Sequence, residues 1–411
     1  MGLAIESDLQ SIDVSDLSLW QQGPPHWLFA QLREQAPVHW SPLNQYPDDG
    51  GFWSITRWED VDRITKDFET FSSERGGILM LTESGLPLVA QQQQMISMDP
   101  PRHDRLKAIF QRGFTPARIA EHEARIREIV RATLDRVAPL GECDLVDDIG
   151  QPVVSRVIGS FIGSDPEDDK RNAEMANMVL AFSDEEVSAS FEEIGTMIEE
   201  SYTEFLDVLA ERRAEPGDDL VSVLAHAVVD GEQLTDFEIF MGIGLLSAAG
   251  NDSTRATFAS GMLALLRDDR QRQLLTDDPS LIPGAVEEFL RCFPAFAHFR
   301  RTATRDVELH GQTIREGDKV VLWYLASNRD ATVFDDADTF DVLRDPKHQA
   351  FGGGGRHFCL GAALARMELR LLVEETLKRF PDMELAGEPV YTKSCFVNQL
   401  KSFPVRFTPQ P

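Results

Sequence analysis

The chain has 411 residues and a net charge of −29, from 69 acidic and 40 basic residues. So acidic a chain is poorly suited to bind nucleic acid or an anionic membrane surface, which argues against both classes of function. The hydrophobic fraction of 42% is enough for a large core, and no low-complexity linker divides the sequence. We therefore expect residues 1–411 to form a single domain.

No part of the sequence predicts export or a membrane anchor. Residues Met1–Trp20 lack the basic start and the apolar centre of a signal peptide. The most apolar run, Ile239–Ala249, is too short to span a bilayer. The four cysteines lie far apart and form no C-x-x-C pair, so neither a zinc site nor a disulfide framework is predicted. We expect a cytoplasmic protein.

In chain order, the pattern predicts a helix at 26–36, a β-type stretch at Phe52–Thr56 and a helix at 58–67. Residues 75–98 are irregular. Helices then dominate, at 102–112, 116–137, 150–162, 167–183, 189–213, 218–228, 236–268 and 282–292. Short strands follow at 299–302, 307–309, 312–314 and 319–325, then a helix from 362 to about 380 and a strand near 404–408. This order predicts a mainly α chain with a small segregated β region, of α+β type.

The long helix expected at Phe237–Leu266 is apolar almost throughout, yet its middle reads Ala249-Gly-Asn-Asp-Ser-Thr254. Buried polar side chains cost free energy unless they are paired, so this segment needs an explanation. A structural explanation is that Ser253 or Thr254 bonds back to a carbonyl one turn earlier, or that Asp252 pairs locally. The functional explanation is a groove over bound oxygen, where an acid and an alcohol relay protons.

Cys359 lies in Phe351-Gly-Gly-Gly-Gly-Arg-His-Phe-Cys-Leu-Gly361, directly before a strong helical pattern. The glycines can take conformations closed to other residues and leave room for a flat ligand. At a helix N-terminus, unpaired N–H groups and the helix dipole favour a thiolate. Such a thiolate is a good fifth ligand for haem iron, where it favours O–O cleavage. The alternative is a buried structural cysteine beside a flexible loop.

The spacing of Gly355, His357, Cys359 and Gly361 resembles the haem-binding signature of the cytochrome P450 family. Phe351 departs from that pattern, since it lies eight residues before the cysteine where the family usually has seven. The resemblance runs from about Trp27 to Pro404. It implies the cytochrome P450 fold, with haem b as cofactor and Cys359 as the axial iron ligand.

The same resemblance assigns roles to further residues. Asp252 would be the acid and Ser253 the alcohol of the proton relay, with Thr254 as the alternative hydroxyl. Glu288 and Arg291, at i and i+3 of a predicted helix, would form a structural ion pair on the proximal side of the haem. The haem propionates would meet a set of cationic and imidazole side chains: His103, Lys107, Arg301, or Arg300 if the register slips, and His357.

The predicted function is a haem-thiolate monooxygenase that inserts one atom of O₂ into a mainly hydrophobic substrate, such as a steroid, terpenoid, fatty chain or aromatic compound. Electrons would come from a separate ferredoxin or flavodoxin with its reductase, docking on a basic patch that includes Arg112 and Arg356. Alternatives are a peroxide-driven peroxygenase, a haem-thiolate isomerase, and a non-enzymatic haem sensor or carrier. The acid–alcohol pair favours the monooxygenase.

Apolar side chains are expected to form the substrate pocket, as in most small-molecule sites. The candidates are Leu245, Ala248, Ala249, Phe296, Ala297 and Val397, with Phe182 and the loop Ile78–Leu81. The segments Arg75–Met98 and Phe182–Ser190 are expected to gate this pocket. The first lacks a sustained helical pattern, and in the second Ser183–Glu186 directly follow the apolar Met178–Phe182, as expected where a buried helix emerges into a solvated turn. The alternative is that both are plain surface loops.

Overall fold

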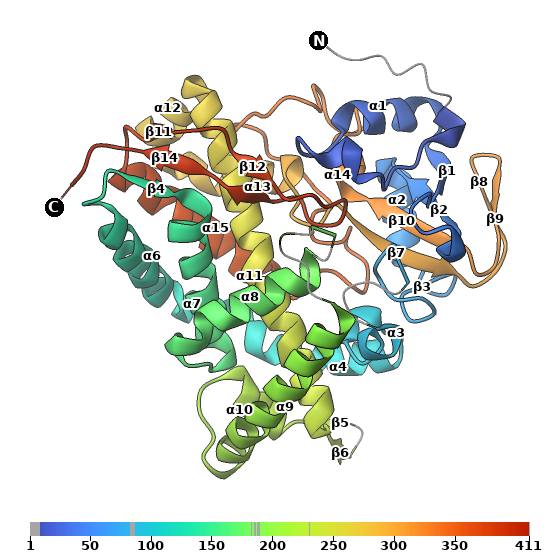
Figure 1. The fold of residues 1–411 in the computed structure, drawn as a ribbon, viewed down its shortest axis with the longest axis horizontal. Coiled ribbons are helices and arrows are strands. Elements are labelled where there is room, and N and C mark those ends of the chain that lie inside the picture. Colours follow the sequence, from blue (N-terminus) through green and yellow to red (C-terminus); the bar gives the residue numbers. More distant parts are fainter. Residues whose placement is uncertain are drawn as a thin grey trace.

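The computed structural model describes residues 9–410 except 83–86, 182, 185, 187–189 and 230. Figure 1 shows helices gathered on one side of the molecule and the main sheet on the other. This arrangement confirms the predicted fold class, a mainly α chain with a segregated β region. Within the described part of the chain, no helix is long and apolar enough to cross a membrane.

The main sheet has five strands in the order β1-β2-β10-β7-β3. It joins segments that are far apart in the sequence, because β2 (Gly51–Ile55) pairs in parallel with β10 (Lys319–Trp323), with Val320 opposite Trp53. The remaining strands of this sheet are β1 (Val38–Pro42), β3 (Phe71–Ser72) and β7 (His298–Ala303). Smaller sheets and hairpins use β4 (Glu142–Asp144), β5 (Val228–Val229), β6 (Glu232–Gln233), β8 (Val307–Leu309), β9 (Gln312–Ile314), β11 (Glu384–Leu385), β12 (Val390–Tyr391), β13 (Leu400–Ser402) and β14 (Pro404–Arg406).

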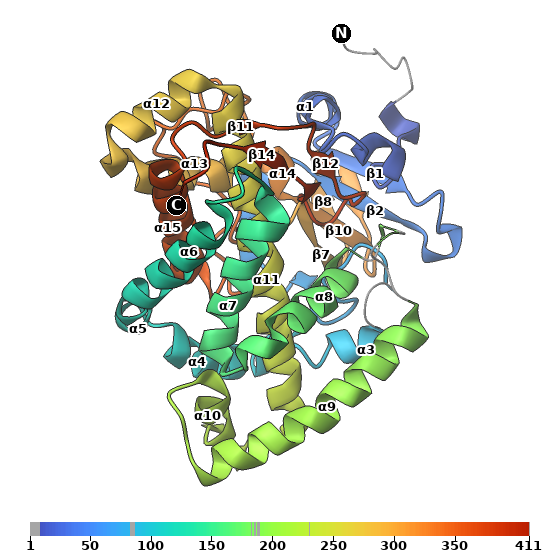
Figure 2. The ribbon, with the colours of Figure 1, turned by 60° about the vertical axis from the view of Figure 1, so that its left-hand side comes forward.

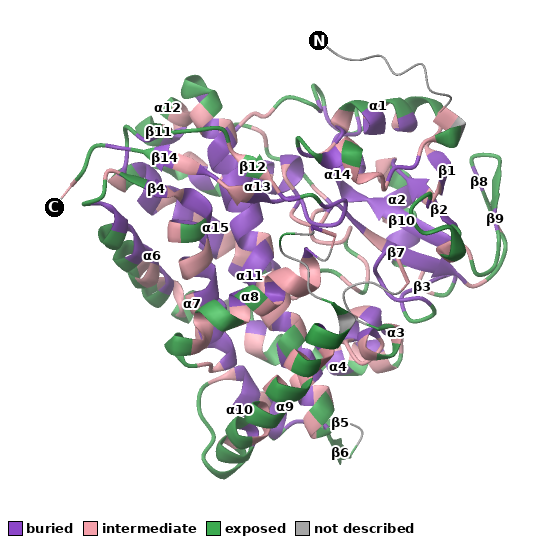
Figure 3. Ribbon diagram, in the orientation of Figure 1, coloured by how far each residue is buried: buried purple, intermediate pink, exposed green. Residues whose placement is uncertain are grey.

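Helix α11 (Asp236–Arg267) runs through the middle of the molecule, and most of its second half is buried (Figure 3). A capping box starts the helix, since Thr235 and Glu238 satisfy each other's backbone N–H groups. Helices α7 (Gln151–Ile162), α8 (Asp169–Leu180) and α15 (Ala362–Arg379) pack against it, and Figure 2 shows α7 and α8 in front of it. The second half of the helix is apolar on most sides because neighbouring elements cover it on most sides.

The other helices surround this centre or cover the sheet. They are α1 (His26–Gln35), α2 (Trp58–Lys66), α3 (Leu88–Gln91), α4 (Arg102–Phe110), α5 (Pro116–Glu121), α6 (Glu123–Val137), α9 (Phe191–Ala214), α10 (Leu220–Ala225), α12 (Asp269–Asp277), α13 (Ile282–Cys292) and α14 (Tyr324–Ser327). Shorter helical turns include η5 (Gln111–Phe114), η6 (Leu145–Gly150) and η7 (Pro166–Asp168). One large hydrophobic cluster fills the space among α4, α6, α7, α11, α13 and α15.

Several elements differ from the sequence prediction. Strand β1 was not predicted. Its residues do not alternate regularly between buried and exposed, and the strand is defined by its pairing with β2. Helix α12 was missed as well, since it is polar on most faces. The helix predicted at 116–137 is broken at His122 into α5 and α6. The helix predicted at 150–162 is extended backwards by one π-helical stretch, η6.

Candidate active site

A largely apolar cavity lies between the middle of α11, the start of α15 and the loop that carries Cys359. Helix α4 and strand β7 close its far end with His103, Lys107 and Arg301. Chain segments from four distant parts of the sequence therefore converge on one chamber. It has the thiol of Cys359 at one wall and basic or imidazole groups at its edge.

The loop before Cys359 is held by its own backbone. The Cys359 amide donates to the Phe351 carbonyl at 2.9 Å, and the Phe358 amide donates to the Gly355 carbonyl at 2.9 Å. The glycines that follow Phe351 have φ angles of 91°, 64° and 79° at Gly352, Gly353 and Gly354. Three successive left-handed residues are accessible only to glycine, and they accommodate the extra residue between Phe351 and Cys359.

The two signature glycines serve different purposes. A Cβ at Gly355 would come within 2.3 Å of the Thr65 carbonyl oxygen on α2, so Gly355 allows close backbone packing. A Cβ at Gly361 would meet nothing within 4 Å, although Gly361 lines the cavity. The open space over Gly361 is therefore a place where a flat cofactor would fit without steric conflict. Phe351 also lines the cavity and packs under the Arg366 guanidinium at 4.7 Å.

The electrostatics of Cys359 correct one expectation. Burial raises the pKa of the Cys359 thiol, and the Gly361 N–H and the cations Lys107 and Arg366 lower it only in part. The helix N-terminus alone therefore does not hold a thiolate, since desolvation opposes the charge. A bound cation at the sulfur would supply the stabilisation that the protein leaves incomplete.

Arg301 is the buried cation of the cavity. It lines the chamber, donates to its neighbour's carbonyl, and has no carboxylate ion-pair partner among the described residues. Burial lowers its pKa. Arg300, one residue earlier on the strand, faces the opposite way and donates to the Leu79 carbonyl and the Thr82 hydroxyl. The alternative register is therefore wrong, because successive strand residues face opposite sides of the sheet.

His103 and His357 lie beside Arg301, with their ring centroids 4.2 Å apart. Burial lowers the pKa of both imidazoles, so both are neutral hydrogen-bonding groups near pH 7. Ser73 and His357 share a hydrogen bond of 3.2 Å. A buried arginine without a carboxylate, flanked by neutral imidazoles, matches the anionic edge of a haem.

Lys107 makes contacts that the sequence did not predict. Its ammonium group lines the cavity but donates to the Phe358 carbonyl at 2.8 Å and to the Arg356 carbonyl. It therefore braces the cysteine loop and lies close enough to Cys359 for the two charges to interact. Because Lys107 also lines the cavity, its contact with a haem propionate stays a prediction beside this contact with the loop backbone.

At the centre of α11, Asp252, Ser253 and Thr254 each make a different contact. Ser253 lines the cavity and donates to the Ala249 carbonyl at 2.7 Å, the back-bonding that the structural explanation anticipated. Thr254 also lines the cavity but donates to Glu368 on α15 at 3.1 Å. Asp252 is buried, lies outside the cavity lining and pairs with Arg255 at 2.9 Å. Among these three, only Ser253 combines cavity access with a hydroxyl free of a side-chain partner.

Glu368 and Arg255 are the site residues that the sequence reasoning missed. Burial raises the pKa of Glu368 to about 8, and the Thr254 hydroxyl opposes this shift only in part. Glu368 is therefore a neutral acid on the cavity wall near pH 7. It lies nine positions after Cys359, in register with Leu364 and Leu371, so an acid on the apolar stripe of α15 was the available signal.

The predicted pocket wall is half correct. Leu245, Ala249 and Phe296 line the chamber. Ala248 does not, because one residue along a helix turns about 100°, and it lines a second cavity between α8, α9 and α11. Ala297 and Val397 lie in neighbouring apolar clusters. The structure adds Met95, Ile96, Phe114, Ile158, Leu246, Leu290, Phe299 and Leu369 to the wall.

The loop Ile78–Leu81 also packs outside this chamber, in clusters with Phe396 and Trp323. Phe182 lies outside the described residues, as does much of the segment 182–190, so gating by the two predicted segments is not tested. Within 75–98, the described residues include the short helix α3 and the turn at Met95–Ser97.

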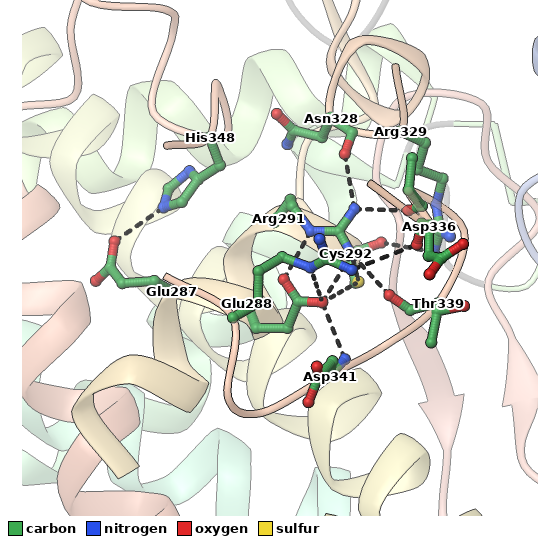
Figure 4. Close-up of polar contacts among 12 residues, drawn as sticks. Glu287, Glu288, Arg291, Cys292, Asn328, Arg329, Asp336, Thr339, Asp341 and His348 are labelled. Carbon is green, nitrogen blue, oxygen red and sulfur yellow. Dashed lines mark hydrogen bonds and ion pairs between the residues drawn. The ribbon is translucent and has the colours of Figure 1, made fainter. Parts of the chain in front are cut away.

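Glu288 and Arg291 form a fully buried bidentate ion pair, with contacts of 2.6 and 2.7 Å (Figure 4). Arg291 also donates to the carbonyls of Asn328, Ala337 and Thr339. Glu288 accepts from the Asp341 amide at 3.0 Å. The pair therefore ties α13 to the segment 328–341 that leads to the cysteine loop, and it does not reach the chamber.

The comparisons with known proteins agree with this geometry. A sequence profile described as Cytochrome P450 matches residues 279–397. The chain is 35% identical to a methyl-branched lipid omega-hydroxylase of Mycobacterium tuberculosis, over 98% of this chain and 96% of the relative. It is 33% identical to linalool 8-monooxygenase of Pseudomonas putida, over 97% and 99%. The structure of cytochrome P450 CYP268A2 from Mycobacterium marinum, in complex with pseudoionone, matches with a TM-score of 0.89 and 34% identity, over 98% of this chain and 100% of that chain.

Proposed function

The chain belongs to the cytochrome P450 family and is a haem-dependent monooxygenase, and we propose that Cys359 provides its axial thiolate within one domain of residues 1–411. The observation that carries this proposal is the chamber whose wall joins Cys359, the open space over Gly361 and Arg301, a cation with no carboxylate partner among the described residues. When bound, the haem supplies oxygen activation. Arg301, His103 and His357 would hold its anionic edge, and the glycine loop would fix the sulfur.

The chain's own residues would then control substrate and protons. Leu245, Ala249 and Phe296 present an apolar surface that orients a hydrophobic molecule and excludes bulk water. The Ser253 hydroxyl, held by the Ala249 carbonyl, would pass protons into the chamber. Asp252 would supply protons to Ser253 from outside the chamber. This acid–alcohol pair supports O₂-dependent monooxygenation over a peroxide-driven or isomerase reaction, neither of which consumes protons in this way.

The proposed substrate is a mainly apolar molecule of the lipid or terpenoid kind. The relatives act on a methyl-branched lipid and on linalool, and the matched structure holds pseudoionone. A largely apolar chamber with a few hydroxyl groups on its wall suits such molecules. The test is a panel of lipids, terpenoids, steroids and aromatic compounds, scored by the shift in haem spin state and then by product formation. Binding restricted to strongly polar ligands would contradict the proposal.

Electrons must come from a partner, and we propose a ferredoxin or flavodoxin with its reductase. Of the two arginines predicted for the docking patch, Arg356 is already paired with Asp104 and lies over the Phe68 ring. Arg112 makes no ion pair within the described part of the chain. Its reversal, Arg112→Glu, should raise the KM for the electron donor and leave the reduced carbon-monoxide spectrum unchanged. An unchanged KM would remove Arg112 from the interface.

A further inference from the structure

His298, the first residue of β7, is a buried histidine with one ring nitrogen left unpaired. The residue is 1% exposed, and its Nδ1 lies 3.1 Å from the Cys395 carbonyl oxygen. A carbonyl only accepts hydrogen bonds, so Nδ1 carries the proton. Burial lowers the pKa of His298 to about 3, so the ring is neutral near pH 7. Nε2 is then a bare acceptor, and it has no hydrogen-bond partner among the described residues.

The same histidine lines a small cavity that is separate from the chamber. The cavity has a volume of about 30 Å³, which is room for one water molecule or one hydroxyl group. Phe299 and Arg301 of β7 line the chamber, and alternate strand residues face opposite sides, so His298 faces away from it. Leu79 and Met80 are among the apolar residues of the small cavity. Its other polar side chains are Ser15, Gln45, Tyr46 and Ser183, of which Gln45 and Tyr46 are exposed.

The two serine hydroxyls of this cavity already have partners. Ser15 donates to the Asp13 carboxylate at 2.5 Å, and Ser183 donates to the Lys393 carbonyl at 3.1 Å. An unpaired buried acceptor costs free energy, so His298 Nε2 is the atom that gains most from a donor placed in this cavity.

Phe396 is the side chain that contacts the walls of both spaces. Its ring centroid lies 5.3 Å from that of Phe296 and 5.7 Å from that of Phe299, and both of these rings line the chamber. The Phe396 ring also packs against His298 at 5.4 Å and lines the small cavity. A layer of aromatic rings therefore separates the chamber from the unpaired nitrogen.

The backbone that carries Phe396 is fixed. Its carbonyl accepts from the Ala297 N–H at 2.8 Å, and its N–H donates to the Ser394 hydroxyl at 3.1 Å. The ring is therefore the part of this segment that can move, by rotation between side-chain rotamers.

The size of the chamber gives a reason for such a movement. The chamber measures about 200 Å³, below the roughly 300–1,000 Å³ of most small-molecule sites, and the haem would take up part of it. A substrate of lipid or terpenoid length therefore needs space beyond the chamber. Rotation of the Phe396 ring would add an arm that ends at His298 Nε2.

We propose that a hydroxyl group at one end of an apolar substrate donates a hydrogen bond to His298 Nε2, and that Phe396 turns aside to admit it. The substrate class is then an apolar molecule with a terminal alcohol, held so that its other end lies at the haem. A charged end group does not fit, because a neutral imidazole in a buried site cannot offset a charge. The inference rests on the proposed monooxygenase function and specifies its substrate.

A matched pair of ligands tests the hydrogen bond. Dodecanol can donate to Nε2, whereas dodecyl methyl ether keeps the chain and the oxygen but cannot donate. Each is titrated into the haem-loaded enzyme and followed by the shift in haem spin state. The wild type should bind dodecanol about three- to tenfold more tightly than the ether, which is the effect of one neutral hydrogen bond.

Two variants of His298 separate its two ring nitrogens. In His298→Asn an amide can still donate to the Cys395 carbonyl, but nothing replaces Nε2, so the preference for dodecanol should disappear. His298→Gln places an amide oxygen near the Nε2 position and should restore part of the preference. A preference that is equal in wild type and His298→Asn would overturn the proposal, as would dodecanol binding through its oxygen to the iron, which reverses the spectral shift.

The proposal and the function on which it rests fail in different ways. If other apolar ligands shift the spin state and the wild type does not prefer dodecanol over the ether, the proposal alone is wrong. A wild-type enzyme without the thiolate band of the reduced carbon-monoxide complex would overturn the function itself.

The role of Phe396 is tested by chain length. Phe396→Leu should tighten the binding of dodecanol by about threefold or more, because the ring no longer has to leave its favoured rotamer. Hexanol is the control, since a short chain stays within the chamber and should bind the variant and the wild type equally. Unchanged or weaker binding of dodecanol to Phe396→Leu would show that this ring does not close the arm.

Nitrogen NMR of the histidine side chains reads the same contact without turnover or a spin shift. In the reduced carbon-monoxide complex, the Nε2 signal of His298 is assigned as the one missing from His298→Asn or, if that variant does not fold, from His298→Gln. Dodecanol should move this signal to lower frequency, because a lone pair that accepts a hydrogen bond is more shielded. The ether should leave it in place. The same spectrum with both ligands would contradict the assigned contact.

Discussion

The cysteine loop and the centre of α11 face each other across one chamber but are built on opposite principles. The loop is held by backbone hydrogen bonds, left-handed glycines and the ammonium group of Lys107. The α11 segment is held by side chains, and two of its atoms, Asp252 Oδ2 and Arg255 Nε, have no partner among the described residues. A metal ligand needs a fixed position, whereas a proton path needs groups that can exchange partners. The comparison shows that the cysteine loop is rigid where the iron ligand lies, while α11 keeps polar atoms without partners where protons would move.

Cys359→Ser should have the largest effect, because it removes the metal ligand and leaves the rest of the loop in place. The loop should keep its backbone geometry, since the bonds that hold it are made by amides and carbonyls. Thiolate ligation should be lost completely, and with it the long-wavelength band of the reduced carbon-monoxide complex. Cys143→Ala is the control, because Cys143 lies on β4, away from the chamber. A surviving band in Cys359→Ser would contradict the assignment of the iron ligand.

The support of the loop can be broken at Glu288. In Glu288→Gln the buried Arg291 loses its countercharge, which costs roughly 3–5 kcal/mol of stability when a buried pair is broken. Urea unfolding, followed by haem absorbance and by circular dichroism, measures the loss. Glu384→Gln is the control, since its ion pair with Arg406 is exposed and should contribute little. Equal midpoints for the two variants would show that the pair does not support the fold.

On the α11 side, Ser253→Ala should separate oxygen reduction from product formation. Peroxide release per reduced nicotinamide should rise by about tenfold, because a positioned hydroxyl contributes at least that much to proton transfer. Haem binding and the spin shift should stay as in the wild type. Thr254→Ala should have the smaller effect, since its hydroxyl is engaged with Glu368. The reverse order would assign the relay to Thr254.

The smallest expected effect concerns Glu368, on the α15 side of the chamber, and the change of protein stability with pH. Burial raises the pKa of Glu368 from 4.5 to about 8, so the folded state holds a proton that the unfolded chain releases above pH 4.5. Stability from this group is therefore complete below pH 4.5 and falls as the pH rises towards 8, by about 1 kcal/mol between pH 6 and 7. Glu368→Gln should abolish this slope in urea unfolding. An identical slope in wild type and variant would show that Glu368 does not bind the proton.

The sequence predicted the parts of the molecule whose signal is local. The glycine run, the helix after Cys359 and the long apolar helix around Asp252 carry their patterns within a few turns. Strand β1 and helix α12 were missed, because β1 is defined by its pairing with β2 and α12 offers only the adjacent Leu274 and Leu275 to the core. Ala248 was placed in the wrong cavity, since a sequence gives a helix face only to within about one residue, and Ala297 and Val397 lie in apolar clusters that form only in the folded chain. Glu368 was missed because its partner Thr254 lies 114 residues away in the chain.

The order of pairing in the main sheet also bears on how the chain reaches this structure during synthesis. Strand β2 ends at Ile55, but its parallel neighbour β10 begins at Lys319, and β7 and β10 must both be made before the five-stranded sheet can close. The β1–β2 hairpin therefore leaves the ribosome long before its partners and carries an unpaired edge in the meantime. Such late, distant pairing slows folding and leaves this strand edge open to wrong pairing with other chains until β10 has been made.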